Sequence, residues 1–194
     1  PCRFCQRYHY FFYLTTKKKT MMRYITLLLL LLPLSTLAQD WKTFDQADIL
    51  FTAKYPADWV NKIKEGKRVF FTSPSESKDD FFAENVNVSV STNPSFGGSL
   101  KIKDLIQEVV DNVKTSFNDF AEESRTALKW NGIDAYEITY TGNTKGDDPT
   151  AVRITQRLCF YKSRLYLATY TALKSGDNFA AIAKQIFNSI KFRS

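Results

Sequence analysis

Few groups of residues in this sequence have the types and the spacing that chemistry requires. Ser75 and Lys78 share the Ser-x-x-Lys spacing of penicillin-recognising enzymes, whose serine is the nucleophile. In those enzymes the serine begins a buried helix, whereas this pair follows Pro74 in a polar stretch, and the chain contains no Ser-Asp-Asn element. We therefore expect an exposed loop at this position and not a catalytic serine.

Pairs of acidic residues are the next candidates, because carboxylate oxygens are the ligands that calcium prefers. They occur at Asp79-Asp80, Glu122-Glu123 and Asp147-Asp148. None repeats at the alternate spacing of a calcium loop, so the pattern predicts solvated charge and no resident cofactor, with a calcium site as the alternative. A hydrolase that pairs two carboxylates is a further alternative, because the separation it needs is spatial.

The N-terminal part of the chain is predicted to be separate from the folded domain. Residues 21–38 open with two methionines and an arginine, continue into an unbroken leucine run at 27–32, and end at Ala38. A cationic start, a short apolar stretch and small residues before the cut are typical of a secretory signal peptide. We expect cleavage after Ala38 and no stable transmembrane anchor, because a membrane span needs roughly 20 apolar residues.

Residues 1–20 precede the two methionines and do not themselves begin with methionine. We interpret them as an upstream extension and leave them out of the fold. They contain Cys2, Cys5 and His9, which could otherwise suggest a metal or redox group.

Removal of residues 1–38 changes the chemistry available to the chain. That segment holds six basic and no acidic residues, so residues 39–194 keep 21 basic against 20 acidic side chains, a net charge of +1. The overall charge of +7 is therefore no sign of nucleic-acid binding. The segment also holds the only histidine, which excludes histidine bases and histidine-ligated metals from the processed protein.

Residues 39–194 are predicted to form one domain in which hairpins alternate with helices. Alternating apolar and polar residues and turn signals predict strands at 49–55, 60–64, 68–73, 85–91, 124–130, 133–141, 151–161 and 164–172. Asn131-Gly132 is the strongest hairpin signal, because both residues tolerate a positive φ angle. Lys162-Ser163 is the expected turn of a second long hairpin.

Two segments have helical spacing. One apolar stripe runs from Ile102 to Phe117 with charged residues opposite, and another runs from Phe179 to Ile190, with Asp177 available as an N-terminal cap. Because hairpins separate the two helices, we expect an α+β fold in which the helices pack on a mainly antiparallel sheet.

Aromatic side chains are plentiful and in the first place predict core packing, with their hydroxyl and indole hydrogens in need of partners. If several were exposed together, they would instead form a recognition surface. The candidates for that surface are Trp59, Trp130, Tyr136, Tyr140, Tyr166 and Tyr170. Cys159, the only cysteine after residue 38, is predicted to be a small buried apolar residue.

A set of short segments along residues 39–194 resembles a known family. The segments are Phe51 to Trp59, Phe70 to Pro74, Asn85 to Val90, Ser99-Leu100, Gly132 to Tyr136, Tyr166, and Phe187 to Phe192. Their order and sequences are similar to the PsbP-like family. The resemblance implies a three-layer α/β/α sandwich with a central, mainly antiparallel sheet and two main helices, shared with Mog and DcrB-like proteins, and a non-enzymatic accessory or protein-binding role.

These observations predict an exported, non-catalytic protein of a bacterial envelope, periplasmic or secreted, that binds another protein. One alternative is a ligand-carrying module with an aromatic-lined pocket of roughly several hundred Å³ between sheet and helix. Another is a hydrolase that uses carboxylates or a lysine gathered in one cleft. Exposed aromatics on a flat patch would favour a protein partner, and aromatics around a hole would favour a small ligand.

Overall fold

The computed structural model describes residues 39–64, 68–96 and 98–193. The chain divides between Ala38 and Gln39 into two units, and every described residue belongs to the second. The expected signal peptide at 21–38 and the upstream extension at 1–20, with Cys2, Cys5 and His9, lie outside the described residues. Within the described part of the chain, no helix is long and apolar enough to span a bilayer.

The described strands form two sheets, and every strand pair in them is antiparallel. The smaller sheet has the order β1-β2-β10 and contains β1 (Trp41–Phe44), β2 (Phe51–Pro56) and β10 (Lys191–Phe192). The larger sheet has the order β3-β4-β5-β9-β8-β7-β6. Its strands are β3 (Val60–Lys64), β4 (Arg68–Thr72), β5 (Asn85–Thr92), β6 (Phe117–Trp130), β7 (Ile133–Thr144), β8 (Ala151–Tyr161) and β9 (Arg164–Leu173).

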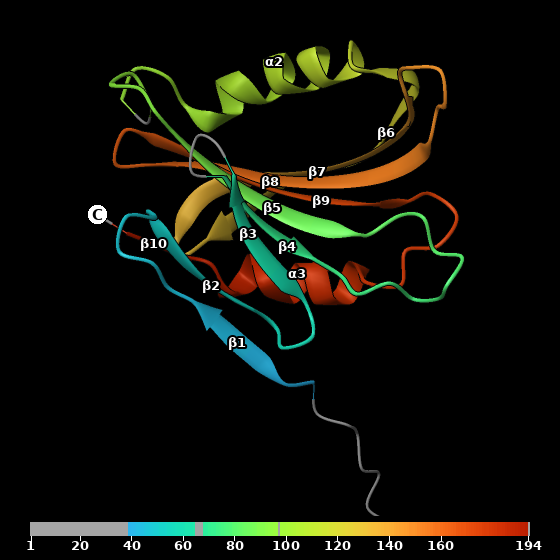
Figure 1. The fold of residues 1–194 in the computed structure, drawn as a ribbon. Coiled ribbons are helices and arrows are strands. Elements are labelled where there is room, and N and C mark those ends of the chain that lie inside the picture. Colours follow the sequence, from blue (N-terminus) through green and yellow to red (C-terminus); the bar gives the residue numbers. More distant parts are fainter. Residues whose placement is uncertain (1–38, 65–67, 97, 194) are drawn as a thin grey trace, which may run out of the picture. The chain divides into compact units, whose positions relative to one another are not determined.

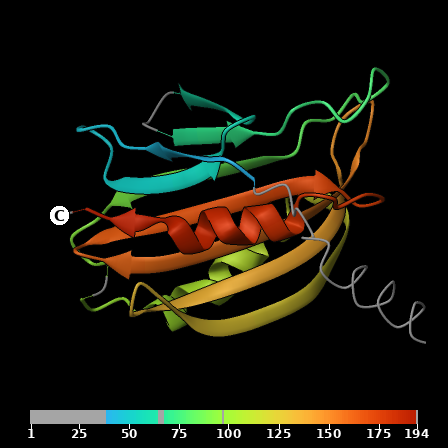
Figure 2. The ribbon, with the colours of Figure 1, turned by 90° about the horizontal axis from the view of Figure 1, so that it is seen from below.

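Two described helices, α2 (Ile102–Lys114) and α3 (Ala180–Ser189), cover opposite faces of the larger sheet (Figures 1 and 2). The apolar stripe of α2 packs on the core side chains of β7 and β8. Residues of α3, among them Ile186 and Phe187, pack on the other face, which α3 shares with the smaller sheet. The α+β fold with a mainly antiparallel sheet is therefore confirmed.

The turn chemistry explains the two long hairpins. Asn131 and Gly132 have φ angles of 51° and 80°, and Lys162 and Ser163 have φ angles of 49° and 56°. Two consecutive residues with positive φ form the type I′ turn, whose twist matches that of the strands it joins. The hairpins predicted at both positions are confirmed.

The boundary between α2 and β6 differs from the prediction. The helix ends at Lys114, and Phe117 begins β6, which was expected only from residue 124. The amide groups of Thr115 and Ser116 donate to the carbonyl oxygens of Asn112 and Val113, which closes the helix with a tight turn. Two register shifts in the first half of β6 interrupt its alternation, and this concealed the strand in the sequence.

The cap predicted for α3 is wrong. Phe179 occupies the N-cap position without a side-chain cap bond. The carboxylate of Asp177 instead accepts a hydrogen bond from the Tyr170 hydroxyl at 2.6 Å and forms an ion pair with Arg153 at 2.8 Å. Asp177 therefore binds Tyr170 and Arg153, both of which belong to strands of the larger sheet.

Candidate functional site

The aromatic residues proposed as a recognition surface do not form one. Trp59, Trp130, Tyr140, Tyr166 and Tyr170 are at most 3% exposed, so the surface interpretation is wrong for these five and the packing interpretation holds. Each contributes a large apolar area to a core that contains no methionine. Burial of that area stabilises the fold, which explains why these rings are not on the surface. The sixth candidate, Tyr136, is half-buried.

Most of the polar ends of these rings have the partners that burial requires. The Trp130 indole donates to the Phe187 carbonyl oxygen at 2.9 Å, and the Tyr166 hydroxyl donates to the carbonyl oxygens of Leu50 and Arg193. The indole nitrogen of Trp59 is buried without a hydrogen-bond partner among the described residues. The buried aromatics are therefore structural, and the functional site must be sought elsewhere.

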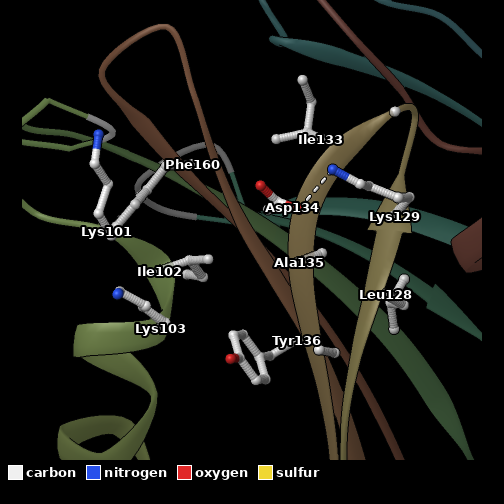
Figure 3. A pocket seen from close by; sticks show the side chains of 12 residues that line it. Lys101, Ile102, Lys103, Leu128, Lys129, Ile133, Asp134, Ala135, Tyr136 and Phe160 are labelled. Carbon is white, nitrogen blue, oxygen red and sulfur yellow. Dashed lines mark ion pairs between the residues drawn. The ribbon is translucent and has the colours of Figure 1, made fainter.

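A pocket of about 780 Å³ lies between the start of α2 and the β6–β7 hairpin (Figure 3). Its volume falls within the range of about 300–1,000 Å³ that is usual for ligand sites. Three elements supply its walls: the start of α2, the hairpin with its turn, and the end of β8. The lining residues are Lys101, Ile102, Lys103, Ala127, Leu128, Lys129, Gly132, Ile133, Asp134, Ala135, Tyr136 and Phe160.

The interior of the pocket is apolar and partly aromatic. Phe160 stacks on Phe96 with a ring separation of 4.8 Å, which fixes its orientation. Tyr136 points from β7 into the space between the hairpin and α2 (Figure 3). Because side chains alternate along a strand, Ala127 and Lys129 on β6 share the face of Tyr136, the face that α2 covers.

The rim of the pocket is positively charged. Figure 3 shows Lys101 and Lys103 on the α2 side and Lys129 on the hairpin opposite. The ammonium group of Lys129 lies 2.6 Å from the Asp134 carboxylate, and both side chains are exposed. Three lysines against one aspartate leave the lining with a net charge of +2. The pocket can therefore hold an apolar group with an anionic group beside it.

The far end of the chain holds the hairpin in place. The Trp130 indole donates to the last turn of α3, and the Asn131 side-chain amide donates to the Ile190 carbonyl oxygen at 2.8 Å. The ammonium group of Lys191, which follows α3, donates to the Asn131 side-chain oxygen at 3.3 Å. These bonds join residues that are about 60 positions apart in the sequence and give the pocket a fixed wall.

Among the residues that line the pocket, only Tyr136 was a candidate site residue from the sequence, and the three lysines were not. Lys101 and Lys103 flank the first residue of α2, where the positive end of the helix dipole favours acidic side chains, and Asp104 in the same turn is one. The two lysines alone were therefore no clear signal of a site.

The other groups considered in the sequence lie apart from the pocket. The Ser75 hydroxyl donates within its own exposed loop, to the Ser77 carbonyl oxygen at 3.1 Å. Among the acidic pairs, Glu122 and Glu123 form ion pairs with Arg125 and Arg153. Among the described residues, no three His, Cys, Asp or Glu side chains converge as metal ligands would.

Cys159 and Glu84 are two of the buried groups whose pKa is raised. Burial raises the pKa of the Cys159 thiol to about 12, as expected for an unreactive core cysteine. Burial also raises the pKa of the Glu84 carboxyl above its ordinary value, and the nearby carboxylates of Glu76 and Asp80 add to this effect. The Ser73 hydroxyl donates to Glu84 at 3.3 Å. Neither group faces the pocket, so neither provides it with chemistry.

The fold agrees with solved structures of low sequence identity. A Pseudomonas aeruginosa protein of unknown function, described as a candidate regulator, has a TM-score of 0.58 at 13% identity, over 79% of this chain and 98% of that chain. The solution structure of cyanobacterial PsbP (CyanoP) from Synechocystis has a TM-score of 0.54 at 15% identity, over 79% of this chain and 93% of that chain. The chain has a PsbP-like fold.

This result confirms the PsbP-like resemblance at the level of the fold. A structure from Bacteroides thetaiotaomicron has a TM-score of 0.52 at 19% identity, over 79% of this chain but only 48% of that chain. The PsbP-like fold thus spans about half of that longer protein. Comparisons of the sequence with known families and with curated proteins find no match.

Proposed function

We propose that the protein is an exported, non-catalytic accessory domain of the cell envelope, periplasmic or secreted, that binds another protein at the pocket beside the β6–β7 hairpin. The PsbP-like fold supports the accessory role, and the sequence of residues 21–38 supports export. We include in the proposal the three-layer α/β/α arrangement, with α3 and the smaller sheet together in one outer layer.

The observation that carries this proposal is the position of the pocket at the outer edge of the larger sheet. Ala127, Leu128 and Lys129 line the pocket and belong to β6, the last strand of that sheet. A pocket next to an edge strand offers main-chain groups as well as side chains to a ligand, and a polypeptide is the ligand that uses both.

The chemistry of the lining supports binding over catalysis. It offers ammonium groups around apolar and aromatic side chains, and its carboxylate, Asp134, is paired with Lys129. The ammonium groups can neutralise an anionic ligand, and the apolar and aromatic side chains can orient it. Acid–base catalysis would instead use a pair of titratable groups with separated pKa values in one cleft.

A small-ligand carrier is the second candidate, and the volume of the pocket favours it. About 780 Å³ would accommodate a compact organic anion, with Tyr136 and Phe160 as the aromatic lining. The two candidates differ in the mass of what occupies the pocket, which an experiment can measure.

Photo-cross-linking in the cells that produce the protein separates these candidates. The photoreactive residue p-benzoylphenylalanine replaces Lys129, an exposed residue on the pocket face of β6, and in a matched control it replaces Lys184, an exposed residue of α3. A protein partner predicts a protein-sized adduct from position 129 only, with cross-linked peptides that come from one partner protein. The adduct should disappear when Ala127→Trp fills the pocket.

Three other outcomes would contradict the proposal. An adduct at position 129 with a mass below that of a peptide would support the small-ligand carrier instead. Equal adducts at positions 129 and 184, or an adduct unaffected by Ala127→Trp, would show that the pocket is not the binding site.

A further inference from the structure

The two edges of the larger sheet are protected to different degrees against another strand. The β3 edge has only five residues, and two of them, Lys62 and Lys64, are exposed lysines. A short, lysine-bearing edge is a common protection against unwanted pairing. The β6 edge has 14 residues, and no described strand pairs with its outer side.

Only the second half of β6 is a regular edge. Both register shifts lie before Ser124, and from Ser124 to Trp130 the pairing with β7 is continuous. Bulges discourage strand addition because they disturb the row of main-chain donors and acceptors. The regular half, from Ser124 to Trp130, therefore presents the row that another strand could use.

The turn determines which main-chain groups point outward. Trp130 and Ile133 flank a two-residue turn, so they exchange hydrogen bonds with each other. Hydrogen-bonded pairs alternate along an antiparallel ladder, which directs the N–H and C=O groups of Ala127 and Lys129 away from β7. These outward groups lie at the wall of the pocket.

We propose that an extended segment of the partner protein adds to the β6 edge between Arg125 and Lys129, places one apolar side chain in the pocket and directs a carboxylate at Lys101 and Lys103. The inference rests on the proposed function and specifies how the partner binds. A residue opposite Ala127 on the added strand would share its face, the face on which the pocket opens.

The charge of the pocket selects the partner. A lining with a net charge of +2 attracts an acidic segment and repels a basic one. It also disfavours a second copy of this chain, because pairing of two β6 edges would bring two such linings together. The occupant is therefore an acidic, partly apolar segment of a different protein.

Selection from displayed random 12-residue peptides tests the charge. Wild-type protein should enrich peptides in which an acidic residue neighbours a large apolar one. In the variant Lys101→Glu/Lys103→Glu the net charge of the lining becomes −2, and the enriched peptides should become basic. The matched control Lys62→Glu/Lys64→Glu reverses two lysines on the β3 edge and should keep the acidic preference. An unchanged preference in the pocket variant, or a reversal in the control, would overturn the assignment of the carboxylate.

A proline substitution tests the added strand. Ala127→Pro removes an outward N–H group and should leave the bonds to β7 intact, because proline is tolerated on the free side of an edge strand. We expect an enriched peptide to bind at least about tenfold more weakly to this variant. Amide hydrogen exchange on the wild-type protein gives a check without substitution: the peptide should slow exchange at Ala127 and Lys129 and leave the β3 edge unchanged.

These experiments can overturn strand addition without overturning binding of a protein at the pocket. A peptide that is lost with Ala127→Trp but binds Ala127→Pro with unchanged affinity, and protects neither amide, would overturn strand addition and leave the pocket as the protein-binding site. A failure to enrich any peptide would overturn the inference, while the cross-link from position 129 would still decide the proposed function.

Discussion

The indole nitrogen of Trp130 donates to the carbonyl oxygen of Phe187 at 2.9 Å, and this bond joins the end of β6 to the last turn of α3. Arg157 lies over both rings, with its guanidinium carbon 5.7 Å from the centre of Trp130 and 5.3 Å from that of Phe187. The same guanidinium forms an ion pair with Glu137 at 2.7 Å. The hairpin that forms one wall of the pocket is thus attached to an element on the opposite face of the sheet.

This attachment predicts unequal costs for two tryptophan substitutions. Trp130→Phe removes ring volume and leaves the Phe187 carbonyl oxygen without the indole donor, whereas Trp59→Phe removes similar volume at a nitrogen that has no described partner. We expect Trp130→Phe to lower the free energy of unfolding by about 1–2 kcal/mol more than Trp59→Phe does. Urea denaturation of both variants measures the difference, and equal losses would show that the bond contributes nothing.

Gly142 is required because β6 approaches it closely. A Cβ atom at Gly142 would lie 2.8 Å from the Cβ atom of Phe117 and 3.2 Å from the Asn118 carbonyl oxygen. Gly142→Ala should therefore destabilise the protein by about 1–3 kcal/mol. If the Phe117 contact is the cause, the double variant Phe117→Gly/Gly142→Ala, which removes that Cβ atom, should be more stable than the sum of the single effects implies. Strictly additive losses in a double-mutant cycle would refute that cause.

The buried Glu84 carboxyl predicts a pH dependence of stability. Because its pKa is raised in the folded protein, the folded state holds this proton to a higher pH than the unfolded state, whose carboxyl titrates near 4.5. Stability from this group is complete below pH 4.5 and declines as the pH rises through the folded pKa. Glu84→Gln should therefore match the wild type at low pH and exceed it at pH 7, as measured by denaturation at both pH values.

Asp80 provides the control of opposite sign. Its pKa is lowered by hydrogen bonds from the amide groups of Glu76 and Phe82, so its contribution is present at neutral pH and lost as the pH falls below about 3.8. Asp80→Asn should lower stability at pH 7. If Glu84→Gln and Asp80→Asn both raised, or both lowered, the stability at pH 7 relative to the wild type, the pKa directions given for Glu84 and Asp80 would be contradicted.

Thiol labelling tests the core and also whether residues 1–20 remain attached to the exported protein. Cys159 is fully buried, and its pKa is raised to about 12, so maleimide should label the native protein more than about a thousandfold more slowly than the unfolded protein. In denaturant, the exported protein should label at one site, Cys159. Labelling at three sites would mean that Cys2 and Cys5 remain attached and that cleavage after Ala38 does not occur.

The local features of the fold could be predicted from the sequence, whereas the site could not. Asn131-Gly132 specifies its hairpin because the positive φ angles belong to the two residues themselves. Phe117 follows Val113 at helical spacing, so only the turn at Thr115 and Ser116 reveals that the helix has ended. The two-residue β10 depends entirely on its pairing with β2 and has no signal of its own.

The pocket was not predictable because it depends on where distant elements meet. Lys101 and Lys103 come from one end of α2, and Lys129 comes from a strand that follows the helix. Their convergence is fixed by the packing of α2 on the sheet and by the attachment of the hairpin to α3. The abundance of aromatics could not indicate exposure either, because the same ring types serve cores and recognition surfaces.

Mapping of amide chemical shifts by solution NMR tests the central claim most directly. The measurement compares the protein alone with the protein bound to a segment of its cross-linked partner. We predict that the largest changes group at the start of α2, along the second half of β6 and around the Asn131-Gly132 turn. Changes grouped instead over α3 or along the β3 edge, with those around the pocket unmoved, would contradict the account.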